Sequence, residues 1–143
     1  MPGFALIDQL MAASSRDPHA DAMIDAGGKA LSREQLLQRV RAISRGFTES
    51  GLQPGERVLF AVRPDAGSIL LMIAIAEAGG VLVPLDPSMG PALFRSRMEL
   101  LAPAWVVAES VLYSATANRW VMRLLCKLGI RLPRLAEVRN ARF

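Results

Sequence analysis

Residues 51–87, GLQPGERVLFAVRPDAGSILLMIAIAEAGGVLVPLDP, decide the fold of this chain. The pair Pro54-Gly55 is a turn signal, because proline fixes φ and glycine readily takes a positive φ. The run 58–62 that follows is continuously apolar. Such a run is typical of a strand that is covered on both faces, as in a parallel sheet.

A helix and a second strand follow in the same stretch. Asp65 is placed to cap a helix over 67–78, which is apolar nearly all round and is therefore expected to be buried. Gly79-Gly80 ends this helix, and the short apolar run 81–83 predicts the next strand. Together these signals predict one strand–helix–strand unit of a parallel sheet.

The alternation continues downstream of this unit. We expect a helix over 92–101, which Pro103 ends, and a third short strand over 105–108. Strands near 58, 81 and 105 with helices between them predict two right-handed crossovers. The predicted fold class is therefore α/β, with a parallel three-stranded βαβαβ core.

Upstream, the sequence predicts a helix, a hairpin and a second helix. The first helix is expected over 4–13, and 22–25 with 29–31 predict a hairpin around Gly27-Gly28. Ser32 opens the second helix, with Gln35 as its capping-box partner. Apolar residues recur at helical spacing until Gly51 ends this helix.

Length and composition limit the classes of protein. The 143 residues suit one ordinary domain, and 52% of them are apolar, which is high for a small soluble domain. This balance predicts a missing partner or a missing remainder of the fold. Cys126 is the single cysteine, so an intrachain disulfide and a multi-cysteine metal site are excluded. With no secretory signal in the opening residues, we expect a cytoplasmic protein.

One stretch has nearly the length of a membrane span. Residues 66–84 carry one charge, that of Glu77, and about 20 apolar residues would cross a bilayer. However, Gly79-Gly80 divides this stretch into a helix-length and a strand-length piece. A buried helix and a buried strand are therefore expected here rather than a span.

Basic side chains are concentrated in the last part of the chain. Residues 111–143 carry seven basic side chains and one acidic, whereas 1–110 carry ten basic and twelve acidic. Within this tail, Arg119, Trp120, Arg123 and Lys127 have the spacing of a basic amphipathic helix with an interfacial tryptophan. These four residues are candidates for contact with an anionic membrane or a partner, and the alternative is a helix whose apolar side docks on its own domain. We divide the chain into a domain over 1–110 and this C-terminal segment over 111–143.

Residues with catalytic potential are few. The chain has neither a dinucleotide fingerprint nor a Walker phosphate loop, and its single histidine, His19, lies in a polar loop. Asp86 and Ser88 follow the second strand, where ligands bind in open α/β sheets, but helix capping is the alternative role for them. We therefore predict no catalytic, cofactor-binding or metal-binding residue. No motif for nucleic-acid binding accompanies the basic tail.

The combined motifs of residues 20–110 resemble the opening of the AMP-dependent synthetase and ligase family. The shared elements are the hairpin with Ile24-Asp25, the cap Ser32, the turn and strand 51–58 and the exit 78–87. Glu56 stands where the family usually has aspartate. The family includes acyl-CoA synthetases, fatty acyl-AMP ligases and peptide-synthetase adenylation domains. The run Asp86-Pro87-Ser88-Met89-Gly90 is most similar to the long-chain, olefin-pathway type of acyl-activating ligase.

The resemblance implies an enzymatic activity, but this sequence lacks the motifs with which the family performs it. Family members use ATP and Mg²⁺ to turn a carboxylic acid into an acyl-adenylate and usually pass the acyl group to a thiol such as that of CoA. Their Ser/Thr/Gly-rich phosphate loop, their later adenylate-binding motifs and their C-terminal catalytic lysine have no counterpart in this sequence. The chain is therefore expected to bind no cofactor and to be catalytically silent by itself.

Two functions of different classes are open. In the first, the chain is the N-terminal part of an acyl-activating ligase in fatty acid metabolism, and it works with the remainder of a split ligase or as a homo-oligomer. In the second, it is a stand-alone interaction module that binds a protein or an anionic membrane surface, which would make it membrane-peripheral.

Overall fold

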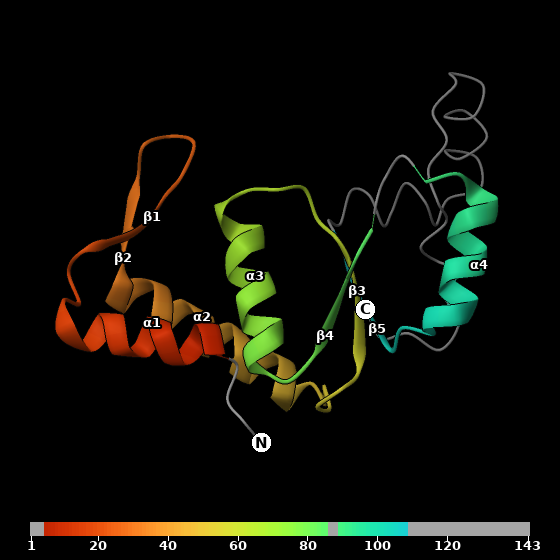
Figure 1. Cartoon of the computed structure of the whole chain (residues 1–143), viewed down its shortest axis with the longest axis horizontal. Coiled ribbons are helices and arrows are strands. Elements are labelled where there is room, and N and C mark those ends of the chain that lie inside the picture. The colour runs from red at the N-terminus through yellow and green to blue at the C-terminus, as the bar shows by residue number, and fades with distance from the viewer. Residues whose placement is uncertain (1–4, 86–88, 109–143) are drawn as a thin grey trace. The chain divides into compact units, whose positions relative to one another are not determined.

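The computed structural model describes residues 5–85 and 89–108, and these form an α/β fold (Figure 1). The chain divides into two compact units. The first takes the described residues of Met1–Gly55 and Arg63–Val81, and the second takes those of Glu56–Val62 and Leu82–Phe143. The C-terminal segment over 111–143, with its expected amphipathic helix, lies outside the described residues.

The first unit contains three helices and a hairpin (Figure 1). Their bounds are α1 at Ala5–Arg16, β1 at Asp21–Ile24, β2 at Ala30–Ser32, α2 at Arg33–Glu49 and α3 at Ala66–Glu77. The two strands pair antiparallel, and α2 packs against both α1 and α3. Apolar side chains from all three helices and from β2 form its core, namely Ile7, Leu31, Leu36, Val40, Leu70 and Ala74.

Local sequence signals set the bounds of α2. Ser32 Oγ accepts the Gln35 N–H at 3.3 Å, and Gln35 Oε1 accepts the Ser32 N–H at 3.2 Å, so the predicted capping box is confirmed. At the other end, Gly51 takes a φ of +96°, which a glycine adopts without the steric cost of a Cβ. The hairpin turn is also confirmed, with Gly28 at a φ of +80°.

The cap of α3 is confirmed as well, but its predicted burial is wrong in part. Asp65 Oδ1 accepts the Ser68 N–H at 2.6 Å and so begins the helix. Leu70 and Ala74 face the core with α2, whereas Ile69 is 46% and Met72 36% exposed. The composition of α3 suggests burial on all sides. However, a helix that packs along one side only leaves its other side exposed.

The second unit is built on a three-stranded parallel sheet. Its strands are β3 at Arg57–Ala61, β4 at Val81–Pro84 and β5 at Trp105–Ala108, in the order β4-β3-β5. Val58 pairs with Trp105 and Ala61 with Ala108, so β3 and β5 run parallel in register. The α/β class with a parallel three-stranded core is thus confirmed, and β3 is the central strand.

Among the described residues of the second unit, one helix packs with this sheet. It is α4 at Pro91–Leu101, with proline at its first turn and Ala102 in the left-handed region just after its end. Phe94 and Met98 of α4 pack on a core that contains Leu59, Ala61 and Val106 from β3 and β5. Leu59 is fully buried, as expected for the middle residue of a central strand.

Candidate functional site

The residues that the sequence singled out for function lie mostly outside the described part. Arg119, Trp120, Arg123 and Lys127 belong to the C-terminal segment, and Asp86 and Ser88 lie in the gap between 85 and 89. Their predicted contacts therefore stay predictions.

His19 and the glycine pairs are described, and each has the structural role expected of it. His19 is an exposed residue between α1 and β1. Gly79, at a φ of +88°, ends α3, and Gly80 donates its N–H to Ile75 O at 2.9 Å. Residues 66–84 are therefore a helix and a strand, as predicted, rather than one continuous span.

The carboxyl ends of the strands form the edge at which open α/β sheets bind ligands. β4 leaves this edge through Leu85, whose N–H donates to Phe60 O at 2.9 Å. The chain returns at Met89, which is 6% exposed and belongs to the core with Phe94. Gly90 is the N-cap residue of α4, which therefore has no side-chain cap. Where β4 ends and α4 begins, the described residues Leu85, Met89 and Gly90 therefore supply no acid, base or nucleophile.

Polar contacts lie instead at the amino ends of the strands. Trp105 Nε1 donates to Glu56 Oε2 at 2.8 Å, which joins the first residue of β5 to the turn before β3. Arg57 Nη1 donates to Leu101 O at 2.7 Å, and Ala104 N–H donates to Arg57 O at 2.9 Å. These contacts hold the end of α4 and the start of β5 on the central strand, so the role of this edge is structural.

These anchoring residues were not identified as such from the sequence. The available signal was Glu56, which stands at the family's usual aspartate position. A carboxylate there accepts the indole N–H of a tryptophan 49 residues away, and no local pattern predicts that pairing.

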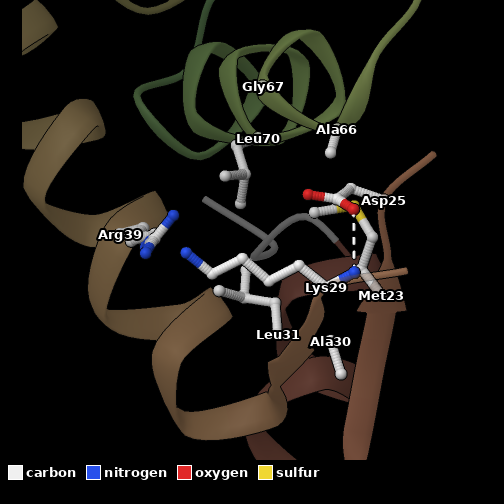
Figure 2. A pocket seen from close by; sticks show the side chains of 9 residues that line it. All are labelled: Met23, Asp25, Lys29, Ala30, Leu31, Arg39, Ala66, Gly67 and Leu70. Carbon is white, nitrogen blue, oxygen red and sulfur yellow. Dashed lines mark hydrogen bonds between the residues drawn. The ribbon is translucent and has the colours of Figure 1, made fainter. Parts of the chain in front are cut away.

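The first unit contains a cavity of 240 Å³, which Figure 2 shows from close by. The hairpin supplies most of its wall, α2 supplies Arg39, and the first turns of α3 supply the rest. The lining residues are Met23, Asp25, Lys29, Ala30, Leu31, Arg39, Ala66, Gly67 and Leu70. In Figure 2 the side chain of Lys29 extends toward that of Arg39, so two cations converge at one side of this cavity.

The turn of the hairpin fixes the position of this wall. Asp25 Oδ1 accepts the N–H groups of Gly27 and Lys29, both at 2.9 Å. Asp25 N–H in turn donates to Lys29 O at 3.0 Å, which closes the turn. No local sequence pattern predicts this cavity, because its cations come from the hairpin and from α2, and its floor includes α3.

The described residues give no support to a metal site or to a membrane-spanning helix. Among residues 5–85 and 89–108, no group of three or more His, Cys, Asp or Glu side chains is arranged to hold a metal ion. Within those same ranges, none of the helices has the length and apolarity to cross a bilayer.

Comparison with known families gives one match that covers most of the chain. Residues 10–132 match the model of the AMP-binding enzyme family. Among curated relatives, the PKS-NRPS hybrid synthetase psoA of Aspergillus fumigatus is 31% identical over 123 residues, or 86% of this chain. The chain spans 3% of the length of that synthetase.

Solved structures share the fold. The N-terminal subdomain of Klebsiella oxytoca NpsA, in complex with anthranilyl-AMSN, matches 73% of this chain with a TM-score of 0.65 at 17% identity. A Rhodopseudomonas palustris protein named as a long-chain-fatty-acid CoA ligase matches 93% with a TM-score of 0.66 at 21% identity. The chain spans 27% and 32% of these two structures, respectively.

Proposed function

The chain belongs to the AMP-binding enzyme family, and we propose from this that it builds the N-terminal scaffold of an ATP-dependent ligase that activates carboxylic acids. The observation that carries the proposal is the match over residues 10–132, which includes both units of the fold. Val58 and Leu59 of the central strand β3 are fully buried, and a structural scaffold requires such close packing.

The chemistry of such a ligase is then supplied by residues beyond those of this sequence. Adenylyl transfer needs donors and a metal ion arranged around developing charge. The sequence has no phosphate loop, and the described carboxyl edge of the sheet is mainly apolar. We infer that ATP, Mg²⁺ and CoA bind to the remainder of the ligase, and that residues 1–143 alone are catalytically silent.

For the acid, we propose a fatty acid. Support comes from the run Asp86-Pro87-Ser88-Met89-Gly90, which is similar to that of long-chain acyl-activating ligases. Amino acids are the competing class, because adenylation domains of peptide synthetases belong to the same family. A cytoplasmic location goes with this proposal, since a chain with one cysteine suits a reducing compartment.

The test is to supply the missing residues. The chain is co-expressed with the polypeptide encoded immediately after Phe143, as a fusion and as a separate chain, and acid-dependent ATP–pyrophosphate exchange is measured. We expect exchange from either assembly with long-chain fatty acids, and Leu59→Ala should reduce it while the exposed Arg41→Ala should not. A folded assembly that binds ATP but shows no exchange with any fatty acid would contradict the proposal.

The second candidate function is contact with a partner or an anionic membrane through the C-terminal segment. The observation that favours it is the spacing of Arg119, Trp120, Arg123 and Lys127 within a strongly basic stretch. Each basic residue near an anionic surface adds about 1 kcal/mol of attraction.

Vesicle flotation tests this second function. The full chain should float with vesicles that contain phosphatidylserine and not with neutral ones. The triple variant Arg119→Gln, Arg123→Gln, Lys127→Gln should lose that binding. A matched control replaces Arg41, Arg45 and Arg97, which are exposed in the described helices, with glutamine. Equal loss in both variants would show a net-charge effect and would refute a specific role for the segment.

A further inference from the structure

The cavity of the first unit has the features of a ligand site that is independent of adenylyl transfer. It is bounded by the hydrogen-bonded turn of the hairpin, by α2 and by the start of α3 (Figure 2). All three elements belong to the same compact unit, so the geometry of the cavity is set within that unit.

Two positive charges face this cavity without an anion between them. Lys29 and Arg39 are exposed, and neither has an ion pair or side-chain hydrogen bond within residues 5–85 and 89–108. Like charges that converge repel each other, and an anion bound between them would add two attractions that outweigh this repulsion. An Arg guanidinium beside a Lys ammonium offers a bidentate fork and a point charge to the same anionic group.

The other walls add an apolar floor. Leu31 and Leu70 are 8% and 6% exposed, and Met23 is half-buried beside them. A volume of 240 Å³ corresponds to about eight water molecules at roughly 30 Å³ each. The cavity therefore suits a ligand of about eight non-hydrogen atoms with an apolar part, below the usual size of a cofactor site.

Asp25 limits the charge of that ligand. Its Oδ1 is occupied by the two backbone N–H groups of the turn, yet its carboxylate remains part of the wall. The three ionisable groups of the lining thus sum to a single positive charge, which favours a monoanion over a dianion such as phosphate. We propose that this cavity binds an amphipathic monoanion, with its anionic group between Lys29 and Arg39 and its short apolar group over Leu31 and Leu70.

The experiment uses the full chain, without ATP or Mg²⁺, and two monoanionic probes of similar length. Hexanoate is a carboxylate, whereas hexanesulfonate is a monoanion that cannot be activated as an acid, so binding of both is independent of the proposed ligase function. In ¹⁵N-labelled protein, saturable shifts are expected at the amides of Lys29 and Gly67. A Kd on the order of 1 mM is expected for a ligand of this size, and it should rise with salt.

Variants and control ligands distinguish specific binding in this cavity from nonspecific attraction to the positive charge of the chain. Lys29→Gln and Arg39→Gln should each raise the Kd about fivefold, whereas Arg41→Gln, an exposed arginine of α2 outside the lining, should leave it unchanged. Hexanol should bind more weakly than hexanoate. The proposal is overturned if no saturable shift occurs, if Arg41→Gln weakens binding as much as Lys29→Gln, or if phosphate binds more tightly than hexanesulfonate.

Discussion

Replacement of Gly79 by alanine is the sharpest test of how residues 51–87 specify the fold. Gly79 has a φ of +88°, and a Cβ added there would lie 3.1 Å from Pro54 Cα. The two segments are also joined by Gly55 N–H, which donates to Gly79 O at 2.8 Å. The turn before β3 and the end of α3 therefore touch backbone to backbone, at a point where neither can move away easily.

Three effects set the expected magnitude. An L-residue at this φ costs roughly 1–2 kcal/mol, and the contact with Pro54 adds about 1–2 kcal/mol of overpacking. Alanine offsets about 0.4–1 kcal/mol of this by restricting the unfolded chain. We expect Gly79→Ala to lower the free energy of unfolding by about 2 kcal/mol.

Gly28 provides the matched control. It has a φ of +80° in the same compact unit, but nothing lies within 4 Å of a Cβ added there. Gly28→Ala should therefore cost only about 1 kcal/mol. Urea unfolding followed by far-ultraviolet circular dichroism compares the two variants, and with a slope of about 1 kcal/mol/M the midpoints should differ by about 1 M. Equal midpoints would refute the argument that close approach to Pro54 requires glycine at Gly79.

Three other substitutions test the cap of α2, the core of the sheet and the buried carboxylate oxygen of Glu77. Ser32→Ala removes the acceptor of the capping box and should cost about 1 kcal/mol in urea unfolding; no loss would mean that the cap is redundant. Leu59→Ala empties a fully buried position of the sheet and should cost roughly 2–5 kcal/mol, read from tryptophan fluorescence, and a loss below about 1 kcal/mol would contradict its place in the core. Glu77→Gln should raise stability by about 1 kcal/mol, because Glu77 Oε2 is buried without a hydrogen bond in the described structure, near the C-terminal end of α3. Glu49→Gln, at the exposed end of α2, is its control and should change stability by less than about 0.5 kcal/mol.

The parts of the fold that sequence predicted are those set by local rules. The caps at Ser32 and Asp65 and the stops at Gly51 and Gly79 each depend on one side chain and its neighbours within a turn. Such signals fix the bounds of helices, and the apolar runs between them fix the strands. The sequence pattern ends the first helix at residue 13, three residues before its end at Arg16, because Ser15 can act within a helix by donating its Oγ–H to Met11 O at 2.9 Å.

Features that depend on distant segments could not be predicted in the same way. The position of β3 between β4 and β5 follows from pairings far apart in the sequence. The exposure of Ile69 and Met72 depends on which side of α3 meets α2. Likewise, Lys29 and Arg39 have no shared motif, and only the packing of hairpin and helices brings them to one cavity.

ATP–pyrophosphate exchange on the purified chain of residues 1–143 tests the central claim most directly. The claim is that this chain is the scaffold of an acid-activating ligase whose chemistry lies in other residues. The assay supplies ATP, Mg²⁺ and a panel of fatty acids and amino acids to a sample shown to be folded by circular dichroism. We predict exchange at the level of the control without acid for every member of the panel. Robust exchange that depends on one of these acids would contradict the account.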